Sequence, residues 1–394
     1  MQLGWLDYSK EDRKKVLSVI DLLSEDDTVD ELGISPIRDG FANLFFPGTS
    51  TIQTRAKYFL IVPYALYYLT LTGETNPGNF LRRLDKLEHE CGKKLVQANA
   101  DGTIGSLSIN RGNWVKRPPS QIYWAGIRSY NIFTAGNLSL REYSHTACKL
   151  NQERKNLKRF RTDNQDEQDD HTAGRESYLS FWNLPYYPQD RNWLHNLNME
   201  LTKKEAEFLK NQIEASHPDS MLAFILANNL VNLPNGFLEL EELIHLFPVT
   251  IQTSYYLAKA FSNFIYGAKI RYNLILSEYE SQQANKLWEE YEPKMTEYAG
   301  LDLNAIFSLL NPGNRLRSFL KSLQRFMLQK ELSAIDKLIH QREIDLKNAS
   351  RARLNRAGQF SHDQWFGGHH LHYRFNDAKI IVDDIFTGLE AKTC

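Results

Sequence analysis

The sequence has few cysteines and almost no net charge, and each shortage excludes a class of protein. The three cysteines, Cys91, Cys148 and Cys394, are an odd number at wide spacings in a chain that lacks a signal peptide. This favours a reducing cytosol, so we expect a cytoplasmic protein. The 47 Lys and Arg residues against 48 Asp and Glu give a formal net charge of −1. A wholly basic nucleic-acid coat is therefore excluded, and any basic binding surface has to be local.

A long apolar run is also missing. The best membrane candidate, 58–69, falls short of the roughly 18 apolar residues that a membrane span needs, and it carries Pro63 in its middle. We therefore expect no membrane association and interpret this run as a buried, kinked core helix.

The sequence lacks the motifs of the common enzyme classes. It contains no glycine-rich dinucleotide or phosphate loop, no Gly-x-Ser-x-Gly elbow, no His-Glu-x-x-His and no Cys-x-x-Cys pair. We therefore expect no catalytic residues of these kinds and no cofactor. A nuclease or nucleotide-modifying enzyme whose site is assembled from distant residues stays open as an alternative.

Apolar residues recur mainly at helical spacing, and the chain is long enough for two domains. Thr202 to Glu205 form a capping box before an apolar helix, Asp219 or Ser220 begins the next helix, and 254–276 keeps a 3.6-residue period typical of a central helix. The predicted fold class is mainly α with two helical domains. The predicted division is an N-terminal helical domain at 1–148, a charged flexible linker at 149–177 and a C-terminal helical domain at 178–394.

The helical spacing of apolar residues is interrupted between Gln97 and Val115. Asp101-Gly102 and Gly105 interrupt short runs such as 107–109, which favours a small β-hairpin or an irregular flap. Helices followed by a hairpin and a further helix would suit a winged-helix-like domain that binds DNA. An ordinary helical domain with a surface hairpin is the alternative.

Hydroxyls, an amide and two cations gather between Pro47 and Lys57, where a helix is expected to begin. Free backbone N–H groups, the helix dipole and a guanidinium would together hold a phosphate. The alternative is that the hydroxyls cap the helix while the cations are solvated. The residues of this candidate site are Thr49, Ser50, Thr51, Gln53, Arg55 and Lys57.

A second candidate nucleic-acid site combines cations with aromatic rings. Arg111, Lys116 and Arg117 lie near Trp114 and the Tyr123-Trp124 pair in sequence. Single-stranded or distorted nucleic acid prefers such a mixture of charge and stacking surfaces. The aromatic residues would equally suit the core, above all Trp124.

A third candidate is the basic region from Arg315 to Arg356. Its eleven cations against four anions give a local charge of +7. A basic stripe on long helices can follow a phosphate backbone, with salt-sensitive affinity. A docking face for an acidic protein and a plain solvated face stay open as alternatives. The residues predicted to contact phosphate here are Arg315, Arg317, Lys321, Arg325, Arg351 and Arg353.

Two groups of potential metal ligands are discounted, so no metal site is predicted. His362, His369, His370 and His372 cluster with Asp363, but their spacing fits no standard metal pattern and the surrounding residues suit a turn with packing aromatics. The acidic run 166–170 lies in the expected flexible segment, which cannot hold catalytic carboxylates rigidly.

Several phrases across the chain carry a family resemblance. The segments 4–9, 46–59 and 119–124, together with Phe261-Ser262 and Tyr272-Asn273-Leu274, resemble a bacterial family of unknown function, DUF6361. The C-terminal Tyr373-Arg374-Phe375 also resembles it, although a Trp would be expected after the Arg.

The resemblance implies a bacterial cytosolic protein encoded in islands that defend against phage, beside large helicases and nucleases. It supplies no active site to carry over. Together with the missing motifs, it predicts an accessory, non-catalytic subunit of an antiviral defence system that binds DNA, a helicase or nuclease partner, or both. A protein-only scaffold with basic docking faces is the third alternative, beside the enzyme.

Overall fold

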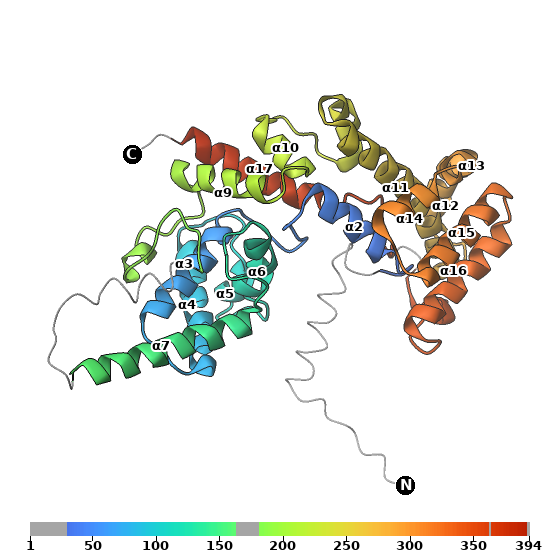
Figure 1. The fold of residues 1–394 in the computed structure, drawn as a ribbon. Coiled ribbons are helices and arrows are strands. Elements are labelled where there is room, and N and C mark those ends of the chain that lie inside the picture. The colour runs from blue at the N-terminus through green and yellow to red at the C-terminus, as the bar shows by residue number, and fades with distance from the viewer. Residues whose placement is uncertain (1–29, 163–180, 362–363, 392–394) are drawn as a thin grey trace, which may run out of the picture. The chain divides into compact units, whose positions relative to one another are not determined.

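The computed structural model describes residues 30–162, 181–361 and 364–391, which are almost entirely helices joined by turns (Figure 1). Within these ranges the only extended pairing is an isolated bridge between Phe133 and Trp182. The predicted mainly α class is thus confirmed. No helix in the described part of the chain combines the length and the apolar character needed to cross a membrane.

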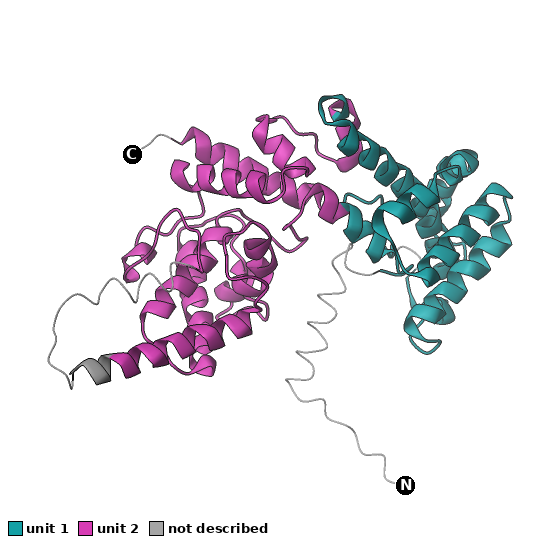
Figure 2. Cartoon of the chain, viewed as in Figure 1, with its two compact units in different colours: residues 1–41, 244–373 teal, residues 42–243, 374–394 magenta. Residues whose placement is uncertain are grey.

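The chain divides into two compact units, each made of two separate stretches of sequence (Figure 2). Unit 1 comprises Met1–Phe41 and Ile244–Tyr373, and unit 2 comprises Ala42–Leu243 and Arg374–Cys394. This division does not follow the boundaries at 148 and 178 that the sequence suggested. Residues 149–162 of the predicted linker continue a helix, and 163–177 lie outside the described residues.

The first group of helices in unit 2 surrounds an apolar one. Helix α3 (Tyr58–Leu71) is buried almost along its whole length and contains Pro63, as predicted. It packs against three other helices, and a cluster of aromatic rings that includes Trp124, Tyr143 and Trp182 fills the space nearby. The remaining helices of this group are α4 (Pro77–Gln97), α5 (Ser106–Asn110), α6 (Pro119–Ser129) and α7 (Leu140–Thr162).

The second group in unit 2 pairs the C-terminal helix with the middle of the sequence. Helix α17 (Phe375–Glu390) packs on α9 (Lys203–Ser216), with α10 (Met221–Ala227) beside them. The predicted capping box begins α9, because the Thr202 hydroxyl accepts from the Glu205 N–H while the Glu205 carboxylate accepts from the Thr202 N–H. Ser220, one of the two predicted starts, caps α10. A Cβ on Gly388 would lie 2.8 Å from Cβ of Ala206, so glycine permits the close approach of α17 and α9.

Unit 1 is organised around its longest helix, α11 (Val249–Leu276), which confirms the central helix predicted from the periodicity. Helices α12 (Gln282–Tyr291), α13 (Met295–Ala299) and α16 (Leu332–Lys347) pack against it, and α15 (Asn314–Leu328) packs on α16 and α13. Helix α14 (Leu303–Leu310) precedes α15.

The two units also contain short 3₁₀ helices, namely η1 (Arg191–Leu194), η2 (Phe237–Glu242), η3 (Ile244–Leu246), η4 (Glu292–Lys294) and η5 (Leu354–Gln359). Helix α2 (Ser35–Phe45) carries the chain from the first stretch of unit 1 into unit 2.

The β-hairpin predicted between Gln97 and Val115 is wrong, and with it the wing of a winged-helix domain. Gly102 and Gly105 turn the chain with φ of +71° and +76°, but the residues that follow form the short helix α5. Ile109 contacts Gly92 of α4, whereas Leu107 is 72% exposed. The alternation of apolar residues that suggested a strand is therefore one turn of a helix lying on α4.

Candidate nucleic-acid interface

The polar segment between Pro47 and Lys57 precedes α3 instead of opening it, which corrects the predicted helix start. The buried Thr49 hydroxyl donates to the Phe46 carbonyl at 2.6 Å. The Gln53 amide donates to the Gly48 carbonyl and accepts from the Ser50 N–H, both at 3.2 Å. Thr49 and Gln53 therefore fix the local turns, and of the four hydroxyl residues in this segment only Thr51 is exposed.

Arg55 is held by a carboxylate from the far end of the sequence. Its Nε lies 2.9 Å from both oxygens of Asp384 on α17, and the Ala56 N–H also donates to that carboxylate at 2.8 Å. Burial is the largest single influence and lowers the pKa of Arg55, but the hydrogen bond to Asp384 and the negative charges of Asp384, Asp101 and Glu200 together raise that pKa above its usual value. A phosphate would have to displace Asp384, so Arg55 serves the fold of unit 2.

Lys57 is engaged in the same way. Its Nζ lies 2.7 Å from the Glu205 carboxylate and 2.9 Å from the Glu200 carbonyl, in a site where both charged side chains are nearly buried. Glu205 thus closes the capping box of α9 and neutralises Lys57 at once. With both cations neutralised from within unit 2, the anion site predicted at 49–57 is not formed by these side chains.

The second predicted site keeps its cations but not its stacking surfaces. Arg111, Lys116 and Arg117 are exposed on the connection between α5 and α6. The ring of Trp114, however, stacks on His89 with centroids 4.8 Å apart, and its Nε1 donates to Asp85 at 2.9 Å. Tyr123 and Trp124 are buried in the core. These rings hold unit 2 together, so the mixture that single strands prefer is not presented here.

Part of the third predicted site, the basic region 315–356, belongs to a buried ionic cluster. The carboxylates of Glu31 and Glu343 are 3% and 0% exposed. Glu31 pairs with Lys347 and Arg353, and Glu343 accepts from the Tyr272 hydroxyl at 2.8 Å and from Lys347 at 3.0 Å. Arg353 is consequently not available for phosphate.

Arg342, also in this region, likewise makes contacts inside unit 1 and is buried. Its guanidinium donates to the Leu32 and Gly33 carbonyls at 2.9 and 3.2 Å and lies over the Phe319 ring at 5.0 Å. The buried cations of α16 thus tie the stretch before α2 to the helices of unit 1.

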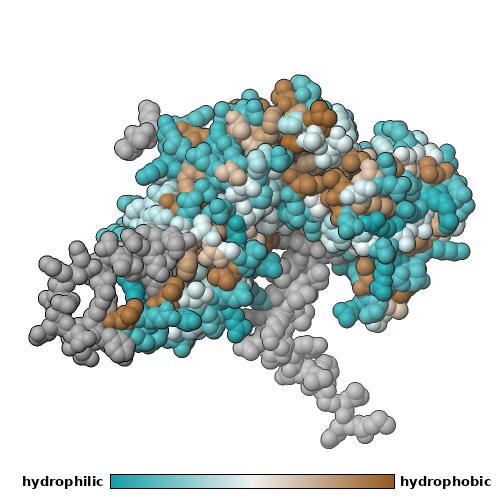
Figure 3. All heavy atoms as spheres, viewed as in Figure 1, coloured by the Kyte–Doolittle hydropathy of each residue, from teal (hydrophilic) through white to brown (hydrophobic). Residues whose placement is uncertain are grey.

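The other part of the basic region is a row of cations along α15. No Asp or Glu occurs between Asn311 and Lys330. Arg317, Lys321 and Arg325 follow one another at every fourth residue and therefore share one face over about 12 Å. The opposite face is buried, and its residues are Leu316, Phe319, Leu320, Leu323 and Met327. In Figure 3 hydrophilic residues predominate over this end of unit 1.

The α15 cations have no carboxylate partner among the described residues. Lys321, Arg325 and Arg315 are exposed and Arg317 is half-buried. Arg317 donates to the Pro312 carbonyl at 2.7 Å and to the Asn311 side chain at 2.6 Å, which fixes its guanidinium without neutralising it. We call Arg315, Arg317, Lys321 and Arg325 the α15 cation row. Of the predicted phosphate contacts outside α15, Arg351 is exposed as well.

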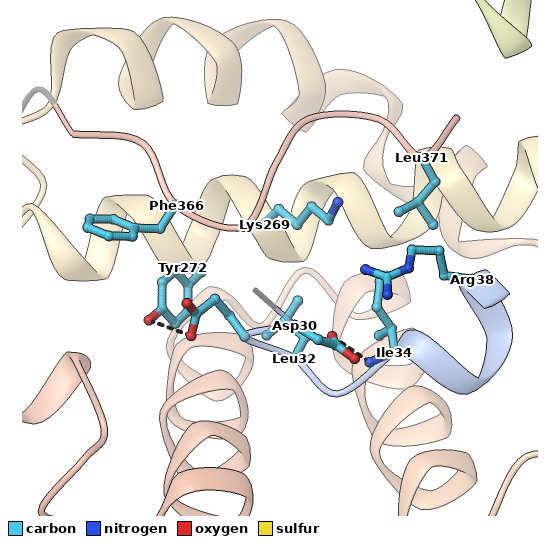
Figure 4. Close-up of a pocket in the computed structure, with 10 residues that line it drawn as sticks. Asp30, Leu32, Ile34, Arg38, Lys269, Tyr272, Phe366 and Leu371 are labelled. Carbon is cyan, nitrogen blue, oxygen red and sulfur yellow. Dashed lines mark hydrogen bonds between the residues drawn. The ribbon is translucent and has the colours of Figure 1, made fainter. Parts of the chain in front are cut away.

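A small cavity in unit 1 is lined by Arg38, Lys269 and Tyr272, with Asp30 and Phe366 beside them (Figure 4). Its volume of about 20 Å³ accommodates one water molecule. The Lys269 ammonium donates to the His369 carbonyl at 2.8 Å. A cavity of this volume is too small to hold a substrate.

The histidine cluster packs against aromatic rings. His369 stacks on Trp365 with centroids 5.1 Å apart, and His370 lies 4.0 Å from the ring of Tyr266. Burial, with Lys269 adding to it, lowers the pKa of His370 to about 4. In the ranges that the structure covers, no three His, Cys, Asp or Glu side chains are grouped as a metal site requires. His362, Asp363 and the acidic run 166–170 lie outside those ranges.

The comparisons with known proteins give one match. The model of a family described as a family of unknown function (DUF6361) matches residues 1–287. No curated protein and no solved structure matches the chain. The α15 cation row lies beyond the matched residues.

Proposed function

We propose that this chain, which belongs to the DUF6361 family, binds DNA by its phosphate backbone through the α15 cation row. The observation that carries the proposal is the absence of carboxylate partners for this row within the described residues. In the other predicted clusters, Arg55, Lys57 and Arg353 pair with carboxylates. The rings near Arg111, Lys116 and Arg117 are either buried or, for Trp114, stacked on His89. The row is thus the surface where an anion gains most from binding.

The geometry of the row suits a polyanion better than a small ion. A single strand of B-DNA places one phosphate per 3.4 Å along the axis, so three to four phosphates of a strand pass along the row of about 12 Å. Within the row, Arg315 lies to one side of the other three cations, and Ser318 and Ser322 widen the polar surface on that side. Binding would release counterions, and four neutralised phosphates would give a salt slope of about −3.6.

We further propose that the protein is an accessory, non-catalytic subunit of a bacterial anti-phage defence system in the cytoplasm, with a helicase or nuclease as partner. This part rests on the family resemblance and on the missing catalytic motifs. Purification of the tagged protein from a host that encodes its neighbouring genes tests it. A helicase or nuclease that stays bound after nuclease treatment supports the proposal, and recovery of the chain alone contradicts it.

The DNA-binding proposal is tested by reversing the α15 cation row. Arg315→Glu, Arg317→Glu, Lys321→Glu and Arg325→Glu together should abolish retention of DNA in a mobility-shift assay at moderate salt. The matched control reverses four exposed lysines of unit 2, Lys86, Lys93, Lys203 and Lys204, and so changes the net charge equally. Retention should survive in the control, because those side chains do not form a row.

Two results would favour the alternatives. Cleavage or modification of labelled DNA by the pure wild-type protein with Mg²⁺ or Mn²⁺ would favour an enzyme. No DNA binding by the isolated chain, together with a partner complex that survives nuclease treatment, would favour a scaffold. Undiminished binding by the fourfold α15 variant would remove the row from the proposal.

A further inference from the structure

A groove of about 690 Å³ lies between α15 and α16, the two neighbouring helices that Figure 1 shows side by side. Phe319, Leu338 and Leu346 supply its apolar lining, and Ser318, Ser322 and Arg315 line it from α15. The volume falls within the range of small-molecule sites. An apolar floor beside a few polar groups suits a flat, partly polar ligand.

The edge of the groove formed by α16 carries a hydrogen-bond acceptor, the carboxylate of Asp345. Gln341 and Asp345 lie one turn apart on α16, and the Gln341 amide donates to Oδ1 of Asp345 at 2.7 Å. The remaining oxygen, Oδ2, has no hydrogen bond to any described residue. A carboxylate oxygen accepts from amino groups and repels phosphate.

The two edges of the groove therefore attract different parts of one ligand. Arg315, on the α15 side, belongs to the α15 cation row and has no carboxylate partner among the described residues. On the α16 side, Asp345 accepts a hydrogen bond, and the neighbouring Arg342 directs its guanidinium to the Leu32 and Gly33 carbonyls. A nucleotide meets both requirements, because its phosphate is anionic and the edges of most bases carry an amino group.

We propose that the groove receives one unstacked base of single-stranded DNA whose phosphates lie on the α15 cation row, and that Asp345 selects bases with an amino group over thymine. This inference rests on the proposed function and adds to the phosphate contacts one base contact that only single strands can make. A base inside a duplex is stacked and paired, so it cannot enter the groove.

The test compares strands of ten cytidines and ten thymidines, with fluorescence anisotropy as the measure of affinity. The wild-type protein should bind the cytidine strand about fivefold or more tightly, which is the lower end of what one good base contact provides. Asp345→Asn should bring the ratio of the two affinities close to one, because the new amide donates to thymine. Glu331→Gln, at the N-cap that precedes α16, removes the same charge away from the groove and should leave the ratio unchanged.

A second variant fills the groove. Ser318→Leu with Ser322→Leu keeps every cation and should lower affinity for the cytidine strand about fivefold, while affinity for duplex DNA stays the same. Equal binding of the two strands by the wild-type protein, or a ratio that Asp345→Asn leaves unchanged, would overturn the inference while the proposed function stands. If the fourfold α15 variant binds both strands like the wild type, the proposed function fails as well.

Discussion

Two sets of cations in unit 1 come from the same basic stretch of sequence, but only one of the sets is paired with carboxylates. Arg342, Lys347 and Arg353 are covered by backbone carbonyls and by the buried carboxylates of Glu31 and Glu343. Arg317, Lys321 and Arg325 have no carboxylate beside them in the described chain. A local excess of positive charge is therefore left free to attract an anion only where the fold brings no carboxylate to it.

The largest expected effect comes from breaking the paired set. Glu343→Ala leaves Lys347 with one carboxylate fewer and removes the acceptor of the Tyr272 hydroxyl and the Leu354 N–H. Removing one partner from a buried ionic network typically destabilises a protein by about 3–5 kcal/mol. Urea denaturation followed by tryptophan fluorescence measures the change.

The control for this variant is Glu331→Ala, at the exposed N-cap of α16, where the glutamate side chain makes no capping hydrogen bond. It should alter the free energy of unfolding by about 0.5 kcal/mol or less. Equal losses in the two variants would show that the buried cluster does not stabilise unit 1.

The next effect concerns a buried carboxyl that has no cation among the described residues. Glu88 on α4 accepts from the N–H and hydroxyl of Ser120 at 2.6 and 2.9 Å, and burial raises its pKa to about 8. The folded state therefore holds a proton that the unfolded state releases near pH 4.5, so its contribution to stability is lost as pH rises from 4.5 through 8. Between pH 4.5 and 7 the loss is on the order of 3 kcal/mol.

Glu88→Gln isolates this contribution, because the amide keeps both contacts to Ser120 and does not ionise. The variant should lose less stability than the wild type between pH 5 and pH 8, as measured by urea midpoints at the two pH values. Parallel pH profiles for the two proteins would contradict the raised pKa.

A smaller effect is expected from Arg55, which the sequence alone suggested as a phosphate contact. Arg55→Ala removes the paired bonds to Asp384 but leaves the Ala56 N–H on that carboxylate. We expect a destabilisation of about 2 kcal/mol, typical of hydrogen bonds to charged groups, and unchanged DNA affinity of the folded protein. A large loss of DNA affinity without a loss of stability would show that Arg55 contacts phosphate after all.

The smallest effect on stability belongs to the α15 cation row. Neutral substitution of its exposed members should change the free energy of unfolding by about 0.5 kcal/mol or less per residue. Thermal unfolding monitored by circular dichroism measures this. A loss of stability as large as that of Glu343→Ala would mean that the row supports the fold. The row and the paired cations would then not differ in their role.

Local patterns predicted local structure well. The capping box at Thr202, the cap at Ser220 and the long period of α11 each depend on neighbours a few residues apart, and all three were confirmed. The hairpin prediction failed because two apolar residues at alternating positions fit one turn of α5 as well as a strand. Periodicity cannot separate these in so short a run.

The candidate site was predicted only in part, because its boundaries depend on distant residues. Asp384 follows Arg55 by 329 positions and Glu31 precedes Arg353 by 322, so nothing near either arginine marks it as paired. The missed residues Glu31, Glu343 and Asp384 lie in ordinary helical or loop sequence. Gln341 and Asp345 were detectable, since their four-residue spacing places both on one face of a helix.

The central claim is that the α15 cation row holds DNA phosphates. Its most direct test is the salt dependence of DNA affinity for the wild type and for a variant with Arg315, Arg317, Lys321 and Arg325 each replaced by Gln. The account predicts that the slope of log affinity against log salt becomes shallower by about 3 to 4 in the variant. Identical slopes for the two proteins would contradict it.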